Sequence, residues 1–161
     1  VVGSVAVGSL SNNIISMNNL NPGPRIISTW KHGVPANKIA WERLKKGEGG
    51  LTAVEYGVRD SEDNPDERSV GYGGLPDREG KVTLDACIMD KNNDCGAVSF
   101  LQNIKNPISV ARMVMEKTPH VMLSGKGAYD FAIKNGFKSM NLLTEKSKED
   151  WKNWISAINF F

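Results

Sequence analysis

Apolar and polar residues alternate most regularly between residues 81 and 90. Four apolar side chains occupy every second position of this stretch: Val82, Leu84, Ala86 and Ile88. Alternation of this kind puts them together on one face of a β-strand. A polar loop at 90–94 comes next, and a second apolar stretch, 97–101, follows the loop. Together these features predict a β-hairpin with one buried face.

Apolar residues spaced three or four positions apart predict helices in other segments, near 36–44, 52–58, 107–117, 128–135 and 147–158. Pro107 suits a first helical turn, where a missing N–H costs little. Thr52 and Ser147 each stand three residues before an acidic residue, a spacing that predicts helix N-caps. Short strands are predicted at 25–30 and 120–123. Strands and helices therefore interleave, and the expected fold class is α/β or α+β.

Composition and charge narrow the class of protein. The 161 residues are enough for one domain with a sizeable core. The 20 basic and 18 acidic residues give a net charge of +2, and no basic stripe with interleaved aromatic residues is present, so no nucleic-acid partner is expected. No run of 18 apolar residues occurs, so no membrane-spanning helix is indicated.

The candidate metal ligands and thiols form weak patterns. Cys87 and Cys95 flank the polar hairpin loop, which is compatible with a cross-strand disulfide or with two free, largely buried thiols. The acidic run 60–67 lacks the spacing of a calcium loop and is interpreted as a solvated loop. Residues 125–127 lack the rest of a phosphate-binding loop and are interpreted as a turn. No metal and no cofactor is therefore expected.

The two ends of the chain differ from its middle. Residues 1–24 are small and apolar and then Asn-rich, which is typical of a flexible extension or of a signal-peptide remnant, and the predicted domain is 25–161. Phenylalanines at 160 and 161 are unusual at a frayed chain end. They suggest a chain that is cut beside a surface on which it packs.

A glycine-rich block, Arg-Ser-Val-Gly-Tyr-Gly-Gly at 68–74 with Pro-Asp at 76–77, is the most distinctive motif. Further segments accompany it in a fixed order: Ser-Thr-Trp at 28–30, Gly-Leu-Thr-Ala-Val-Glu at 50–55, Thr-Leu-Asp-Ala at 83–86, and Ile-Lys-Asn-Pro-Ile-Ser-Val-Ala-Arg at 104–112 with Thr-Pro-His-Val at 118–121. With these segments, the chain from about residue 26 to 154 closely resembles the glycosylasparaginase (aspartylglucosaminidase) family of N-terminal nucleophile hydrolases.

The resemblance implies a fold and an activity. It implies an α+β fold that is half of a four-layer αββα sandwich, completed by a separate β chain from the same self-cleaving precursor, and a dimer of αβ heterodimers. The threonine that begins the β chain attacks the amide between an asparagine side chain and N-acetylglucosamine, with its own α-amine as base. This chain contains no His-Asp-Thr sequence and is expected to be the α subunit, inactive alone. A periplasmic or secreted location is implied for a bacterial protein, and a lysosomal one for a eukaryotic protein.

Three residues are candidates for the site. Trp30 matches a family tryptophan at the substrate pocket, although a core tryptophan at a strand end would have the same spacing. His32 stands where relatives often have phenylalanine and is a candidate for contact with the leaving group. Ser69 matches a serine near the nucleophile, where its hydroxyl supports the threonine, although a turn serine is the simpler interpretation from the residues alone. Thr83 and Asp85 are expected to hold the sheet and its turns.

Two other interpretations remain open at this point. One is the α subunit of a plant-type L-asparaginase/isoaspartyl peptidase, which shares the fold and the threonine nucleophile. The other is a truncated, non-catalytic homologue. Half a sandwich exposes one apolar sheet face, however, and such a face favours aggregation unless a partner covers it.

Overall fold

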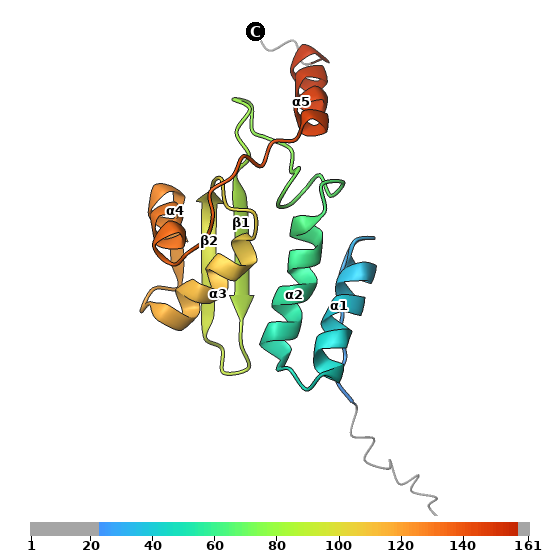
Figure 1. Ribbon diagram of the computed structural model, residues 1–161, viewed down its shortest axis with the longest axis vertical. Helices are drawn as coiled ribbons and strands as arrows, with labels where there is room; N and C mark the ends of the chain where they lie inside the picture. Colours follow the sequence, from blue (N-terminus) through green and yellow to red (C-terminus); the bar gives the residue numbers. More distant parts are fainter. Residues whose placement is uncertain (1–22, 158–161) are drawn as a thin grey trace, which may run out of the picture.

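The computed structural model of the chain describes residues 23–157. Its elements are α1 (Gly33–Lys45), α2 (Gly50–Asp63), β1 (Leu84–Met89), β2 (Cys95–Leu101), α3 (Pro107–Lys117), β3 (Met122–Ser124), α4 (Gly125–Lys134) and α5 (Glu145–Ala157). They form a mixed α+β fold around one small sheet (Figure 1). The extension predicted for 1–24 lies almost entirely outside the described residues.

The sheet has the strand order β1-β2-β3. β1 and β2 form the predicted antiparallel hairpin, and β3 joins β2 in parallel. Cys87 lies opposite Ala97 rather than Cys95, and both cysteines are free. Cys87 is exposed and Cys95 is half-buried. The prediction of largely buried thiols is therefore wrong, because Cys87 alternates with Ile88 and points to the opposite face of the strand.

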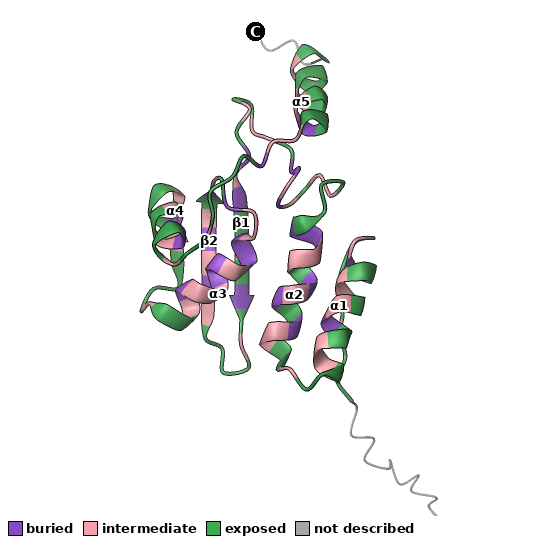
Figure 2. Cartoon of the chain, in the orientation of Figure 1, coloured by how far each residue is buried: buried purple, intermediate pink, exposed green. Residues whose placement is uncertain are grey.

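One face of the sheet is covered by helices. α3 packs on β1 and β2, and α4 packs on β2 and β3. Figure 2 shows buried residues on β1 and α3, and also on α2. The core on this face contains Ile88, Val98, Leu101, Ile104, Ile108, Val110, Ala111, Val114, Ala128 and Ala132. Gly96 permits the close approach of α3, since a Cβ there would lie 2.1 Å from the carbonyl oxygen of Ala111. The opposite face of the sheet carries exposed side chains, among them Met89 and Met122.

The helix pair α1–α2 stands beside the sheet (Figure 1) and joins it through polar contacts between α2 and α3. Arg112 of α3 forms an ion pair with Glu55 at 2.8 Å and donates to the hydroxyl of Thr52 at 3.1 Å. The Ser109 hydroxyl donates to Glu55 at 2.5 Å. Thr52 is thus inside α2 and faces α3, and the predicted helix start at Thr52 is wrong. α2 begins at Gly50 after an extended Gly49, which is a favourable N-cap residue.

The segment 25–30, predicted as a buried strand, is not a strand in the structure. A strand needs a neighbour for its backbone hydrogen bonds, and within residues 23–157 this segment has none. Instead, residues 24–28 line a groove of about 430 Å³ against α1 and α2. Ile27 remains 90% exposed there.

Three local predictions are also corrected by the structure. Residues 60–63 of the predicted acidic loop form the last turn of α2, and residues 125–127, predicted as a turn between elements, form the first turn of α4. Ser147 is fully buried inside α5, where its hydroxyl donates to the carbonyl of Gly73 at 2.6 Å. Its amide donates to the Thr144 hydroxyl, so Thr144 does the capping that was assigned to Ser147. No helix within 23–157 has the length and apolar character needed to cross a membrane.

Candidate functional site

The glycine-rich block fixes the position of Ser69 by packing against the end of α2. Gly71 has a left-handed backbone, φ 56°, and a Cβ there would lie 2.0 Å from the carbonyl oxygen of Glu62. The next amide, of Tyr72, donates to that oxygen at 2.8 Å. A Cβ on Gly73 would lie 2.5 Å from the carbonyl oxygen of Pro65, and the Gly73 amide donates to the carbonyl of Leu142. These glycines are needed because any side chain would push the loop off the helix.

A tight turn before α1 displays Trp30 to solvent. The Trp30 backbone is left-handed, φ 66°, a conformation that non-glycine residues adopt only when their surroundings hold it. Its carbonyl accepts the amide of Gly33 at 3.2 Å, and a Cβ on Gly33 would lie 2.1 Å from the Ser28 hydroxyl. The Trp30 side chain is 82% exposed. It is therefore not a core residue among the residues that the structure describes.

The Trp30 turn and the Ser69 loop meet through His32. Its Nδ1 atom lies 2.9 Å from the carboxylate of Glu67, and both side chains are about one-quarter exposed. The His32 and Trp30 rings are inclined by only 9°, with their centroids 6.5 Å apart, which is within the range of aromatic pairs. Two of the predicted site residues are thus adjacent, and the third follows Glu67 by two positions.

A cavity of about 260 Å³ lies between these two segments. It is lined by Ser28, Thr29, His32, Gly33, Ala36, Val58, Ser61 and Val70. Ser69, next to Val70, is exposed, and its hydroxyl has no hydrogen-bond partner within the part of the chain that the structure describes. Among the residues that the structure describes, those that line this cavity form no nucleophile–base pair.

Two charged residues near the cavity, Arg68 and Glu62, connect this part of the chain to α5 and α3. Arg68 pairs with Asp150 of α5, while its Nε and Nη1 atoms are buried without a partner among residues 23–157. Glu62 is 2% exposed, and its Oε1 accepts the amide of Ile108 at the start of α3, at 3.0 Å. Burial nevertheless raises the pKa of Glu62 to about 8, because desolvation disfavours the charged carboxylate.

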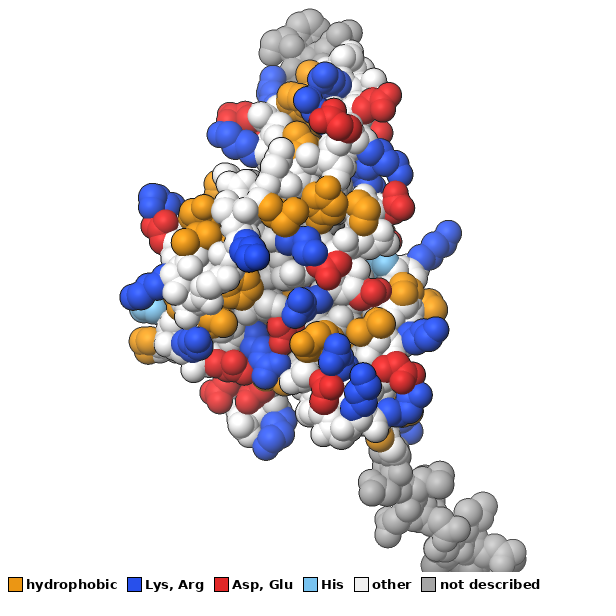
Figure 3. Space-filling model, in the orientation of Figure 1, with side chains coloured by type: hydrophobic (Ala, Val, Ile, Leu, Met, Phe, Trp, Pro, Cys, Tyr) orange, Lys and Arg blue, Asp and Glu red, His pale blue; other side chains and the backbone are white. Residues whose placement is uncertain are grey.

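Two other acidic residues of the run 60–67, Asp63 and Asp66, have basic partners. Asp63 pairs with Lys105 at 3.0 Å, and Asp66 pairs with Lys146 at 2.9 Å. Hydrogen bonding to Lys146 lowers the pKa of Asp66. Figure 3 shows acidic and basic side chains interspersed over this face of the molecule, which fits the balanced charge of the sequence.

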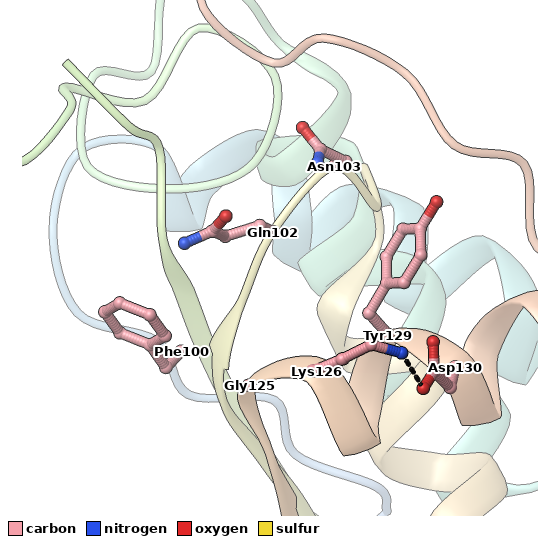
Figure 4. A pocket seen from close by; sticks show the side chains of 7 residues that line it. All are labelled: Phe100, Gln102, Asn103, Gly125, Lys126, Tyr129 and Asp130. Carbon is pink, nitrogen blue, oxygen red and sulfur yellow. Dashed lines mark hydrogen bonds and ion pairs between the residues drawn. The ribbon is translucent and has the colours of Figure 1, made fainter.

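A larger cavity, of about 430 Å³, lies at the end of β2 (Figure 4). Its lining residues are Phe100, Gln102, Asn103, Gly125, Lys126, Tyr129 and Asp130. Lys126 and Asp130 point toward one another and form an ion pair at 2.5 Å, so neither charge is left for a ligand without breaking this pair. The cavity contains none of the predicted site residues and is separate from the one beside His32.

Sequence reasoning missed Glu67 and Glu62. Both lie in the acidic run that was interpreted as a solvated loop, and nothing in the spacing of that run distinguishes them from Asp63 or Asp66. Their partners, His32 and Ile108, are 35 and 46 residues away in the chain. Only the folded arrangement brings them together. Asp85, by contrast, does what was expected, since it accepts the amide of Phe100 at 2.8 Å and holds the hairpin.

Comparison with known proteins gives a consistent picture. A family profile described as "Asparaginase" matches residues 28–160. An N(4)-(beta-N-acetylglucosaminyl)-L-asparaginase from Elizabethkingia miricola is 59% identical over 137 residues, covering 85% of this chain and 40% of that protein. The rat protein of the same name is 43% identical over 137 residues, covering 84% and 39%. A putative one from Drosophila grimshawi is 45% identical over 136 residues, covering 81% and 34%. The chain thus spans about two fifths or less of the length of these relatives.

Proposed function

Because the chain belongs to the asparaginase family, we propose that it is the α subunit of an amidohydrolase that cleaves N4-(β-N-acetylglucosaminyl)-L-asparagine. The observation that carries the proposal is the 59% identity to a protein of that name over 85% of this chain. The remaining part of the enzyme, a β chain from the same precursor, supplies the threonine nucleophile. That chain completes the four-layer sandwich by stacking on the open face of the sheet.

The open face of the sheet supports the proposal that a second chain completes the fold. Met89 and Met122 are 60% and 53% exposed, and exposed apolar side chains on an uncovered sheet face favour association. One cavity is lined by Ser28 and Thr29 from one segment of the family resemblance and by Val70 from another. In the proposed enzyme, Trp30 and His32 wall the substrate pocket, and Ser69 supports the threonine from the other side.

The proposed roles assign no bond-breaking step to this chain. Its residues bind the leaving group, exclude water from one side of the substrate and orient the partner's threonine. The threonine hydroxyl attacks the amide carbon, and its own α-amine takes the proton. The amide C–N bond then breaks as this proton passes to the leaving aminosugar, and water hydrolyses the resulting ester to release aspartate. Neither a metal nor an organic cofactor takes part in the proposed reaction.

The test is an assay of the complete protein, produced from its full gene, on N4-(β-N-acetylglucosaminyl)-L-asparagine. Release of aspartate and the aminosugar is expected. Trp30→Ala is expected to raise KM or lower kcat without changing the melting temperature, because Trp30 is 82% exposed. Phe131→Ala, which removes an aromatic ring that packs on the core, is the matched control and is expected to lower the melting temperature.

Hydrolysis of L-asparagine or an isoaspartyl dipeptide in place of the glycosylated substrate would assign the protein to the asparaginase/isoaspartyl peptidase branch instead. Absence of all three activities from a correctly assembled protein would overturn the proposal.

A further inference from the structure

His32 lines the cavity and contacts Glu67, a residue outside the lining. Glu67 lies in the loop before the glycine-rich block, and His32 ends the turn before α1. Their contact of 2.9 Å is made by Nδ1 of the imidazole. In a neutral imidazole, a carboxylate this close to Nδ1 favours the proton on Nδ1 over the proton on Nε2. It also fixes the rotation of the ring.

The fixed imidazole lies nearly parallel to the Trp30 indole, with 9° between the ring planes. The two rings form a flat wall whose outer part, Trp30, is 82% exposed. With Nδ1 committed to Glu67, Nε2 is the remaining polar atom of the His32 ring. It has no hydrogen-bond partner among residues 23–157. A half-buried acceptor beside a flat apolar wall matches a ligand that combines an apolar face with hydroxyl or N–H donors.

We propose that Glu67 is a positioning residue that makes the site selective for a glycosylated asparagine over free asparagine. This inference rests on the proposed function. Glu67 holds His32 in the Nδ1–H form, so that Nε2 accepts a hydrogen bond from a hydroxyl or N–H of the aminosugar. The apolar face of the sugar ring then lies along the Trp30–His32 wall. Free asparagine has no group that reaches this wall, so its hydrolysis does not depend on Glu67.

The experiment compares two substrates in the complete two-chain protein: N4-(β-N-acetylglucosaminyl)-L-asparagine and L-asparagine. Glu67→Ala is expected to raise KM for the glycosylated substrate about five- to tenfold, the effect of one lost hydrogen bond. The kcat for the glycosylated substrate, and both KM and kcat for L-asparagine, are expected to stay within about twofold of the wild-type values. This pattern is expected when a variant loses binding energy that the ground state and the transition state share. Glu67→Gln keeps an oxygen that accepts from Nδ1–H and is expected to restore most of the affinity.

Two further variants separate positioning from folding. His32→Phe keeps a flat ring without nitrogen atoms and is expected to raise KM as much as Glu67→Ala does. The double variant is expected to be no worse than either single variant, since both remove the same contact. Glu79→Gln is the control, because that carboxylate is 74% exposed and pairs with Lys81 on the surface.

Equal losses on both substrates, additive effects in the double variant, or no effect of Glu67→Ala would each overturn the inference while the proposed function stands. If Glu67→Ala fails to assemble, His32→Phe serves as the primary variant, and its KM for the glycosylated substrate is expected to rise about five- to tenfold. An unchanged KM would overturn the inference. A wild-type protein that hydrolyses neither substrate would overturn the proposed function together with this inference.

Discussion

The two faces of the sheet are made by the same strands but differ in what covers them. On the face under α3 and α4, Val98 and Leu101 are 1% and 0% exposed. On the opposite face, Met89 and Met122 are 60% and 53% exposed. An apolar side chain left in water contributes little to folding. The covered face therefore accounts for the stability of this chain, and the open face is accounted for by association with the proposed β chain.

The largest expected loss of stability comes from disrupting the packing of α3 on the covered face of the sheet. In Gly96→Ala, the new Cβ would lie 2.1 Å from the carbonyl oxygen of Ala111 and 2.7 Å from the amide nitrogen of Met115. Both are backbone atoms, so α3 must move away from the sheet. A loss of about 3 kcal/mol in the free energy of unfolding is expected, measured by urea denaturation of the complete protein.

Gly127→Ala is the matched control for that variant. Gly127 lies in α4 with nothing within 4 Å of a built Cβ, and alanine is the better helix former by about 1 kcal/mol. A small gain in stability is expected. If the two variants were equally stable, α3 would not be packed as tightly as the covered face requires.

The next effect tests the open face. Met122→Glu places a charge where the proposed β chain stacks, and it is expected to weaken assembly of the two chains by about 2–3 kcal/mol. The measurement is the fraction of protein in which the chains co-elute on size-exclusion chromatography as a function of concentration. Lys91→Glu, an exposed change in the hairpin loop, is the control. Unchanged assembly of Met122→Glu would mean that the open face is not the interface.

A smaller effect concerns the polar contact between the helix layers. The pKa of Glu62 is raised from 4.5 to about 8, so the folded protein keeps this proton at pH values where the unfolded chain has lost it. The free energy of unfolding therefore falls as pH rises from about 5 to 8, by about 1–3 kcal/mol from this group. Below about pH 4.5 the full contribution is present.

Glu62→Gln is expected to remove this slope, and the difference between the two proteins in thermal denaturation from pH 5 to 8 is the measurement. Glu79→Gln, at a carboxylate that is 74% exposed, is expected to keep the wild-type slope. Parallel curves for wild type and Glu62→Gln would show that Glu62 is ionised in the folded protein.

The smallest expected loss of stability concerns a hydrogen bond within the β1–β2 hairpin. Asp85 accepts the amide of Phe100 at 2.8 Å, so Asp85→Ala leaves that amide without its partner. A loss of about 0.5–1 kcal/mol is expected in urea denaturation. Asp85→Asn retains the accepting oxygen and is expected to lie close to wild type. A larger loss in Asn than in Ala would show that the charge, not the hydrogen bond, is what matters.

Elements with strong local patterns could be predicted from the sequence. The β1–β2 hairpin follows from the alternation at 82–88, and the start of α3 follows from Pro107. The covered face was also predictable, since Leu84 and Ile88 are 5% and 4% exposed. Each of these depends on residues within a few positions of one another, where side-chain period and turn chemistry decide the outcome.

Features that depend on distant partners could not be predicted. Residues 25–30 have the composition of a strand but no neighbouring strand within 23–157. Ser147 has the spacing of a cap, yet its hydroxyl binds Gly73, far away in the sequence. The contact of His32 with Glu67 depends on how the glycine-rich block packs against α2. That packing cannot be predicted from the spacing of nearby residues.

The most direct test of the central claim is intact-mass analysis of the native protein, with N-terminal sequencing of any chain that co-purifies. The account predicts two chains, of which the second begins with threonine and stays bound to this one. A single uncleaved chain, or a stable protein that contains only these 161 residues, would contradict the claim that the open face of the sheet is completed by a catalytic partner.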